Sequence, residues 1–200
     1  MNERLRKQMD FILEIDKQKE IMRQTYLADG SRKEGDAEHA WHMAVMALLL
    51  GEYAKEPVDT LHVVSLVLVH DLVEIDAGDT YAYDSAGNTT KKEREEKAAS
   101  RIFGILPDDQ AEQLRGLWEE FERMDTPESR FANALDKIQP ILLNAASNGR
   151  SWSEHGVCEG QILRRNCRTP EGAPELWDYA KSLIDAFVEK GIIKKDGFSC

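Results

Sequence analysis

Three polar side chains stand at the end of the most apolar stretch of the sequence. Residues 61–79 read LHVVSLVLVHDLVEIDAGD, and a helix that is apolar on nearly all sides is expected inside a core. His70 and Glu74 are four residues apart, so a helix would place both on one face, with Asp71 beside His70. Buried charged groups are costly unless they are paired or bind a metal. A functional site therefore explains these residues better than solvent exposure does.

His39 and Asp136 extend this group to two histidines and two aspartates from separate segments. Imidazole nitrogens and carboxylates suit divalent ions such as Mn, Fe, Co, Ni and Zn, and four such ligands leave positions open on a six-coordinate ion. Each residue also has a structural interpretation: a lone histidine is commonly a buried structural residue, and Asp136 could pair with a nearby basic side chain. The joint arrangement favours one divalent metal ion bound by His39, His70, Asp71 and Asp136.

Three motifs carry these residues: EHAWHMA at 38–44, VHDLVEIDAGD at 69–79 and NALDKIQ at 133–139. Together they resemble the HD-domain metal-dependent phosphohydrolases over most of the chain. More narrowly, the chain is similar to the branch that contains the bacterial 5′-deoxynucleotidases and their archaeal and human relatives. That branch carries HDxxE followed by Gly-Asp, and Glu74 and Asp79 fall at the matching spacing here.

The resemblance implies a phosphomonoesterase that releases phosphate from nucleoside 5′-monophosphates by attack of metal-activated water. It assigns one divalent ion (Mn, Co, Fe, Ni, Zn or Mg) to the two histidines and two aspartates. Asp71 would also be catalytic, and Glu74 would orient the water or shuttle a proton. Asp79 would contact the substrate, although a turn residue after Gly78 is the simpler structural interpretation. A homodimer is expected from the same resemblance.

The substrate-binding residues of that branch are only partly present. Gln18 and Lys19 stand where the deoxynucleotidases have an Arg-Trp pair, whereas Met22 and Arg23 are retained. We expect Lys19 and Arg23 to contact the substrate from a rim formed with the loop at 76–90, because Arg can bind phosphate bidentately and Lys supplies a point charge. Without the Trp, base stacking should be weaker, so discrimination among bases should be poor.

Other functions fit parts of the same pattern. Hydrolases of ppGpp typically carry HDxxED, and Ile75 follows Glu74 here, which disfavours that activity. Dinuclear HD phosphodiesterases need further histidines after the HD pair, and His155 is the sole histidine downstream of His70; a surface position is the favoured interpretation of His155. Another small phosphorylated metabolite as substrate, or a non-catalytic metal-binding helical module, would use the same ligands.

Helical periodicity dominates the chain, and no convincing strand pattern is present. The sequence predicts an all-α, single-domain bundle of the HD-domain type, with about seven or eight helices around a central helix at 59–75. Another helix should begin at Asp36 as its N-cap. Its inner side is expected to carry Trp41, Val45, Leu48 and Leu49. The core motifs span 38–139, and residues 150–200 form a C-terminal helical extension of one domain covering 1–200.

Composition narrows the partners. The formal net charge is −11, which argues against binding a nucleic-acid polymer but leaves room for a small phosphorylated substrate. The longest apolar run is too short to cross a bilayer, and the charged N-terminal residues lack a signal-peptide core, so a cytoplasmic location is expected. Cys158, Cys167 and Cys200 are expected to be reduced thiols.

Overall fold

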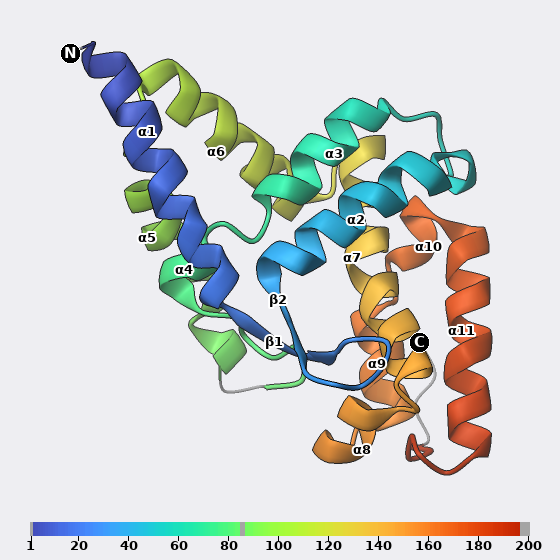
Figure 1. The fold of residues 1–200 in the computed structure, drawn as a ribbon. Helices are drawn as coiled ribbons and strands as arrows, with labels where there is room; N and C mark the ends of the chain where they lie inside the picture. Colours follow the sequence, from blue (N-terminus) through green and yellow to red (C-terminus); the bar gives the residue numbers. More distant parts are fainter. Residues whose placement is uncertain (1, 85–86, 197–200) are drawn as a thin grey trace.

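The computed structural model describes residues 2–84 and 87–196, which are mostly helical (Figure 1). The helices of ten residues or more are α1 (Glu3–Ile15), α2 (Asp36–Leu50), α3 (Thr60–Val69), α5 (Lys91–Phe103), α6 (Asp108–Arg123), α7 (Pro127–Ala146) and α11 (Pro174–Glu189). The shorter elements are α4 (Glu74–Ala77), α8 (Arg150–His155), α9 (Glu159–Arg165) and α10 (Thr169–Gly172), with 3-10 turns η1 (Asp16–Glu20), η2 (Gly51–Tyr53) and η3 (Gly87–Thr89). The predicted all-α class is confirmed, and seven long helices in the described residues agree with the expected number.

The central helix is shorter than predicted. Asp59 caps α3 as its carboxylate accepts hydrogen bonds from the next backbone N–H groups, but the helix stops at Val69 and a turn separates it from α4. His70 Nδ1 donates to the carbonyl oxygen of Val67 (2.8 Å), an acceptor that a continuing helix would use for its backbone. The turn then closes with backbone bonds between residues three apart. The prediction of one helix over 59–75 was therefore wrong in its second half.

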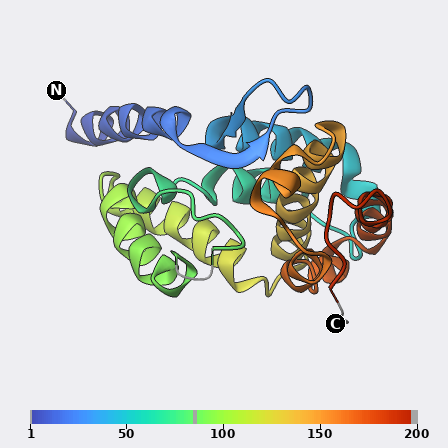
Figure 2. The same ribbon diagram turned by 90° about the horizontal axis from the view of Figure 1, so that it is seen from below.

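Two groups of buried apolar side chains meet at this break. The first lies among α2, α3, α7 and α11 and includes Val63 and Leu66; the second lies among α1, α5 and α6 and includes Leu72 and Val73. In Figure 2, α1, α5 and α6 lie on the left, and α7 and α11 lie on the right. Because most of α3 contributes to one core, and its last residue and the following turn contribute to the other, the polar residues at the turn lie on the boundary between them.

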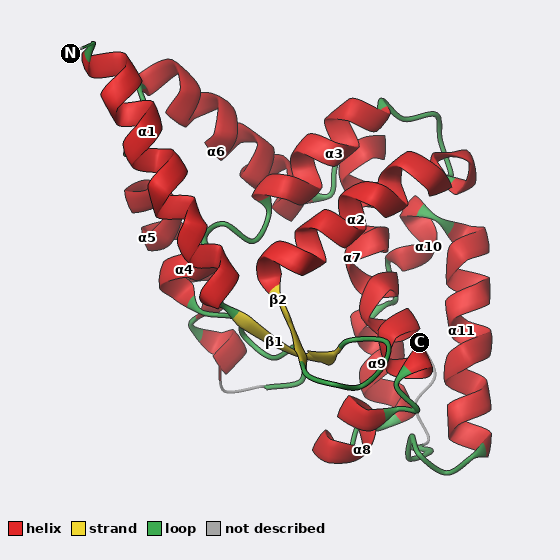
Figure 3. Ribbon diagram, in the orientation of Figure 1, coloured by secondary structure: helices red, strands yellow, loops and turns green. Residues whose placement is uncertain are grey.

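A short antiparallel hairpin contradicts the expectation that the chain has no strand. The hairpin pairs β1 (Met22–Tyr26) with β2 (Lys33–Gly35), in the register Met22↔Gly35 and Tyr26↔Lys33 (Figure 3). Its strands read MRQTY and KEG, which are too short and too polar to show an alternating apolar pattern. The hairpin matters for the site because it carries Arg23 inward, where the side chain is buried.

The inner face of α2 also differs from the prediction. Trp41, Leu48 and Leu49 are more than 60% exposed, and Val45 is half-buried. The face that enters the core carries His39, Ala40, Met43, Met46 and Ala47. The helix has apolar residues on more than one face, so periodicity alone could not decide which face is inside. Gly35, not Asp36, is the N-cap, and Asp36 is a fully buried residue of the first turn.

The C-terminal segment folds as several short helices before α11. The helical extension expected at 150–200 begins with α8 and α9, with a left-handed Gly156 between them. No helix among the described residues is both long and apolar enough to span a membrane. Cys158 and Cys167 are free thiols, and Cys200 lies outside the described residues.

Gly172 marks a close approach that gives a stability prediction. A Cβ atom at Gly172 would lie 2.1 Å from the carbonyl oxygen of Arg130 in α7, whereas a Cβ at exposed Gly116 in α6 would meet nothing within 4 Å. We expect Gly172→Ala to destabilise the fold by about 1–3 kcal/mol, since the α7 backbone must move. Gly116→Ala should stabilise it by about 0.5–1 kcal/mol, because alanine is the better helix former. Urea unfolding of both variants measures this, and equal effects would contradict the packing described.

Candidate metal centre and adjoining hollows

Three candidate ligands converge from α2, the end of α3 and α7. His39 Nε2 lies 3.2 Å from Asp136 Oδ1, and His70 Nε2 lies 4.0 Å from the same oxygen. One donor atom from each of His39, His70 and Asp136 lies within 4.8 Å of the others. Asp71 Oδ2 is 2.9 Å from His70 Nε2, so all four predicted ligands are brought together.

The imidazoles are held by their other ring nitrogens. His39 Nδ1 donates to Gln139 Oε1 (3.1 Å), and this orientation of the Gln139 amide is set by its Nε2, which donates to Glu34 (2.6 Å). His70 Nδ1 donates to Val67 (2.8 Å). Both Nε2 atoms therefore carry the lone pair, as in metal-binding histidines. His70 Nε2 is buried and faces carboxylate oxygens of Asp71 and Asp136, a position that fits a metal ligand.

The pKa values of the histidines and of Asp136 bear on whether this site can bind a cation. Burial lowers the pKa of His39 to about 4, so its imidazole is neutral at pH 7. Burial alone would raise the pKa of Asp136, but the neighbouring His39 and the Arg165 charge hold that pKa well below its usual value. Burial also opposes the charged form of His70, yet the charge of neighbouring Asp71 raises its pKa.

A second carboxylate group adjoins the first. Donor oxygens of Asp36, Asp71 and Glu74 lie within 4.8 Å of one another, and one oxygen of Asp36 and one of Glu74 have no hydrogen-bond partner among the described residues. Burial raises the pKa of Asp36 to about 7 and that of Glu74 well above its usual value, and the charge of Asp71 adds to both shifts. Arg23 Nη1 partly balances this charge, at 2.8 Å from Asp71 and 3.4 Å from Asp36. This number of buried carboxylates favours the binding of additional positive charge at the site.

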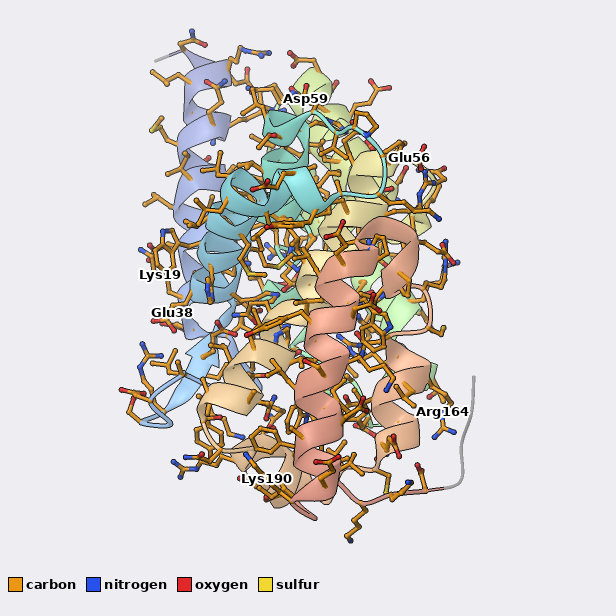
Figure 4. All side chains as sticks on the ribbon, turned by 90° about the vertical axis from the view of Figure 1, so that its right-hand side faces the viewer. Lys19, Glu38, Glu56, Asp59, Arg164 and Lys190 are labelled. Atoms are coloured by element: carbon orange, nitrogen blue, oxygen red, sulfur yellow. The ribbon has the colours of Figure 1, made fainter. Side chains whose placement is uncertain are left out.

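The two predicted basic contacts lie in different places. Arg23 was expected on the rim and does line both hollows, but it is buried against Asp71 because the hairpin points it inward. Lys19 is not brought to the site: it is exposed on η1, where it pairs with Asp16. Figure 4 shows Lys19 beside Glu38 on the outside of the molecule, and both line a separate hollow. The 3-10 turn after α1 sends this side chain outward.

Two hollows open on the candidate ligands and share a boundary. The first, which we call the metal hollow, has about 750 Å³ of empty space, open solvent included, and contains His70, Asp71, Glu74 and Asp136. The second, the side hollow, has about 610 Å³ of empty space, open solvent included, and lies between the loop after α4 and the segment from α7 to α9. Five residues line both hollows: Arg23, Asp79, Thr80, Lys137 and Arg165.

Sequence reasoning missed several residues of these hollows. Lys91, Lys137 and Arg165 line the metal hollow, and Arg165 Nη2 lies 3.9 Å from Asp136 Oδ2. Only the Lys137 position, next to Asp136, could have been inferred from spacing; Lys91 and Arg165 come from distant helices. His155 is exposed, as expected, and its ring packs on Tyr81 with centroids 4.5 Å apart.

The sequence matches the HD domain family over residues 15–177. The chain belongs to this family. A solved structure of a predicted metal-dependent phosphohydrolase from Magnetospirillum magnetotacticum MS-1 is 49% identical, covers 95% of each chain and superposes with a TM-score of 0.91. The family resemblance inferred from the three motifs is thereby confirmed, together with the helical fold of that family.

Curated relatives carry a more specific name. Human 5′-deoxynucleotidase HDDC2 is 35% identical over 111 residues, which are 56% of this chain and 53% of that protein. The 5′-deoxynucleotidase hdd1 of Schizosaccharomyces pombe is 26% identical over 114 residues, covering 55% of this chain and 56% of that protein. The chain thus spans about half the length of the curated relatives it matches.

The geometry predicts different outcomes for two histidines. His70→Ala should remove stoichiometric Mn²⁺ binding, and with it the rise in melting temperature that a ligand binding only the folded state produces. His62 pairs with Glu120 (2.9 Å) away from the centre, so His62→Ala should keep both. Calorimetry and thermal unfolding with and without Mn²⁺ measure this. Full Mn²⁺ binding by purified His70→Ala would contradict the ligand assignment.

Proposed function

We propose that this HD-domain protein is a metal-dependent phosphohydrolase that releases phosphate from nucleoside 5′-monophosphates. The observation that carries the proposal is the convergence of buried donor atoms of His39, His70 and Asp136, beside a hollow lined by the basic residues Lys91 and Arg165. Proposed metal ligands and the basic side chains that would bind phosphate thus line the same cavity. The names of the curated relatives and of the solved structure support the same reaction.

His39, His70, Asp71 and Asp136 would hold one divalent ion, with Mn, Co, Fe, Ni, Zn and Mg as candidates. When bound, the ion would polarise the phosphate ester and activate water for the attack. Arg23 holds Asp71 in place through the 2.8 Å contact. Gln139 fixes the orientation of His39 through the hydrogen bond at Nδ1.

Substrate orientation is assigned to residues around the metal hollow. Lys91 and Arg165 would attract the phosphate, because both line the hollow, where Lys91 pairs with Glu95 and Arg165 with Asp136. Asp79 stands on the boundary of the two hollows, where it could accept a hydrogen bond from the sugar. Glu74 lies beside Asp71, where it would accept or deliver a proton during the attack.

The wider organisation is also a proposal. We propose that residues 1–200 form a single HD domain, with 150–200 as an extension that supplies Arg165 to the site. We further propose a homodimer, which the exposed apolar side chains of α2 support, among them Trp41 and Leu49. A cytoplasmic location remains the expectation from the sequence.

A phosphate-release panel tests the reaction. With Mn²⁺ or Co²⁺ added, several nucleoside 5′-monophosphates should release phosphate, while 3′-monophosphates and phosphodiesters should not. If another phosphorylated metabolite releases phosphate much faster than every nucleotide, the proposed substrate is wrong. The proposed phosphohydrolase activity then still stands. If no phosphomonoester is hydrolysed by metal-loaded protein, the chain is instead a non-catalytic metal-binding module.

The Glu74→Gln variant distinguishes a role of Glu74 in proton transfer from a role in metal binding. The amide keeps the size of the buried side chain but cannot exchange a proton, so kcat should fall roughly 10²–10⁴-fold while Mn²⁺ remains bound. Exposed Glu112 on α6 provides the control, and Glu112→Gln should leave kcat and metal content unchanged. Loss of metal together with activity in Glu74→Gln would make Glu74 a ligand or structural partner instead.

A further inference from the structure

The side hollow is not required by the chemistry at the metal centre, yet it opens directly onto it. It is bordered by the loop after α4, by α7 and by the α8–α9 segment. We propose, on the basis of the proposed function, that this hollow binds the nucleoside part of the substrate, with Tyr81 and Asn144 as the residues that determine its fit. The phosphate would then lie in the metal hollow.

Aromatic side chains form one wall of the side hollow. Tyr81 and Tyr83 meet edge to face with ring centroids 5.3 Å apart, and Tyr81 also packs on His155 at 4.5 Å. Trp152 lines the hollow too and is buried against Phe187 at 5.3 Å. The neighbouring rings thus restrict the Tyr81 side chain before a ligand binds, which lowers the entropy cost of stacking a planar base on it.

A buried acceptor points to a polar planar ligand rather than an apolar one. Asn144 is 5% exposed and lines the side hollow; its Nδ2 donates to the Pro140 carbonyl oxygen (2.9 Å). That bond fixes the amide orientation, since the opposite orientation would set two oxygens against each other. Asn144 Oδ1 is left without a hydrogen-bond partner. A buried acceptor of this kind suits an N–H of a base or a hydroxyl of a sugar.

The charge distribution sets the direction of the ligand. Lys137 and Arg165 stand on the boundary shared by the hollows, whereas the far part of the side hollow contains Ile141, Trp152 and Asn144. An anionic group is therefore favoured at the boundary and a neutral ring system beyond it. A nucleoside 5′-monophosphate has this arrangement, with its phosphate at one end and its base at the other. The aromatic contacts come from the loop after α4 and the C-terminal segment, and not from the position of the missing Trp near Lys19.

The test compares a 2′-deoxynucleoside 5′-monophosphate with 2-deoxyribose 5-phosphate, which lacks the base. We expect kcat/KM for the nucleotide to exceed that for the sugar phosphate, and Tyr81→Ala to reduce this ratio about ten-fold, a typical effect of removing one base-stacking contact. Tyr81→Phe keeps the ring and should keep the ratio. Tyr179 is 60% exposed on α11, and Tyr179→Ala serves as the matched control. Calorimetric binding of the nucleotide to metal-free protein gives a readout independent of turnover.

The outcomes separate the two proposals. If both substrates are hydrolysed but Tyr81→Ala leaves the ratio and the nucleotide Kd unchanged, the nucleoside assignment is overturned and the phosphohydrolase stands. If nothing is hydrolysed but nucleotide binding weakens about ten-fold in Tyr81→Ala, the hollow binds nucleosides and the proposed reaction is wrong. If the wild-type protein neither binds nor hydrolyses the nucleotide, both proposals fail.

Discussion

The burial of ionisable groups at the boundary of two apolar cores is the constraint on which the rest of this structure depends. His39 and His70 are almost completely buried, and their Nε2 atoms face carboxylates of Asp136 and Asp71. Such groups are tolerated only where charges and hydrogen bonds balance them. Arg23 supplies part of that balance, and a divalent cation would supply the rest. The hairpin and the break after α3 are the structural means by which these side chains meet.

Each part of the fold contributes to this boundary from a different direction. The turn after α3 places His70 and Asp71 between the cores, α2 and α7 bring His39 and Asp136, and the C-terminal helix α9 adds Arg165. The two hollows differ in the side chains that line them. The metal hollow is lined by proposed metal ligands and by basic side chains, and the side hollow is lined by aromatic and amide groups. A ligand with a charged end and a planar end fits this division better than a compact anion does.

The sequence allowed the helical fold, the family and the clustering of His39, His70, Asp71 and Asp136 to be predicted, because HD and its companion motifs combine rare polar residues with an apolar helix. It could not show that the helix ends before His70, where the His70 side chain donates a hydrogen bond to the Val67 carbonyl oxygen. Nor could it predict the polar hairpin that buries Arg23, or the outward direction of Lys19. The inner face of α2 was assigned wrongly because Trp41 and Leu48 follow helical spacing equally well. Arg165 and Asn144 join the hollows through tertiary packing, which local patterns do not contain.

The central claim is that one divalent ion binds between His39, His70, Asp71 and Asp136. Anomalous diffraction from crystals saturated with Mn²⁺ tests it most directly. We expect one strong anomalous peak within coordination distance of the Nε2 atoms of both histidines and of a carboxylate oxygen from each aspartate. A saturated crystal without a peak there, or with a peak bound only by Asp36 and Glu74, would contradict it.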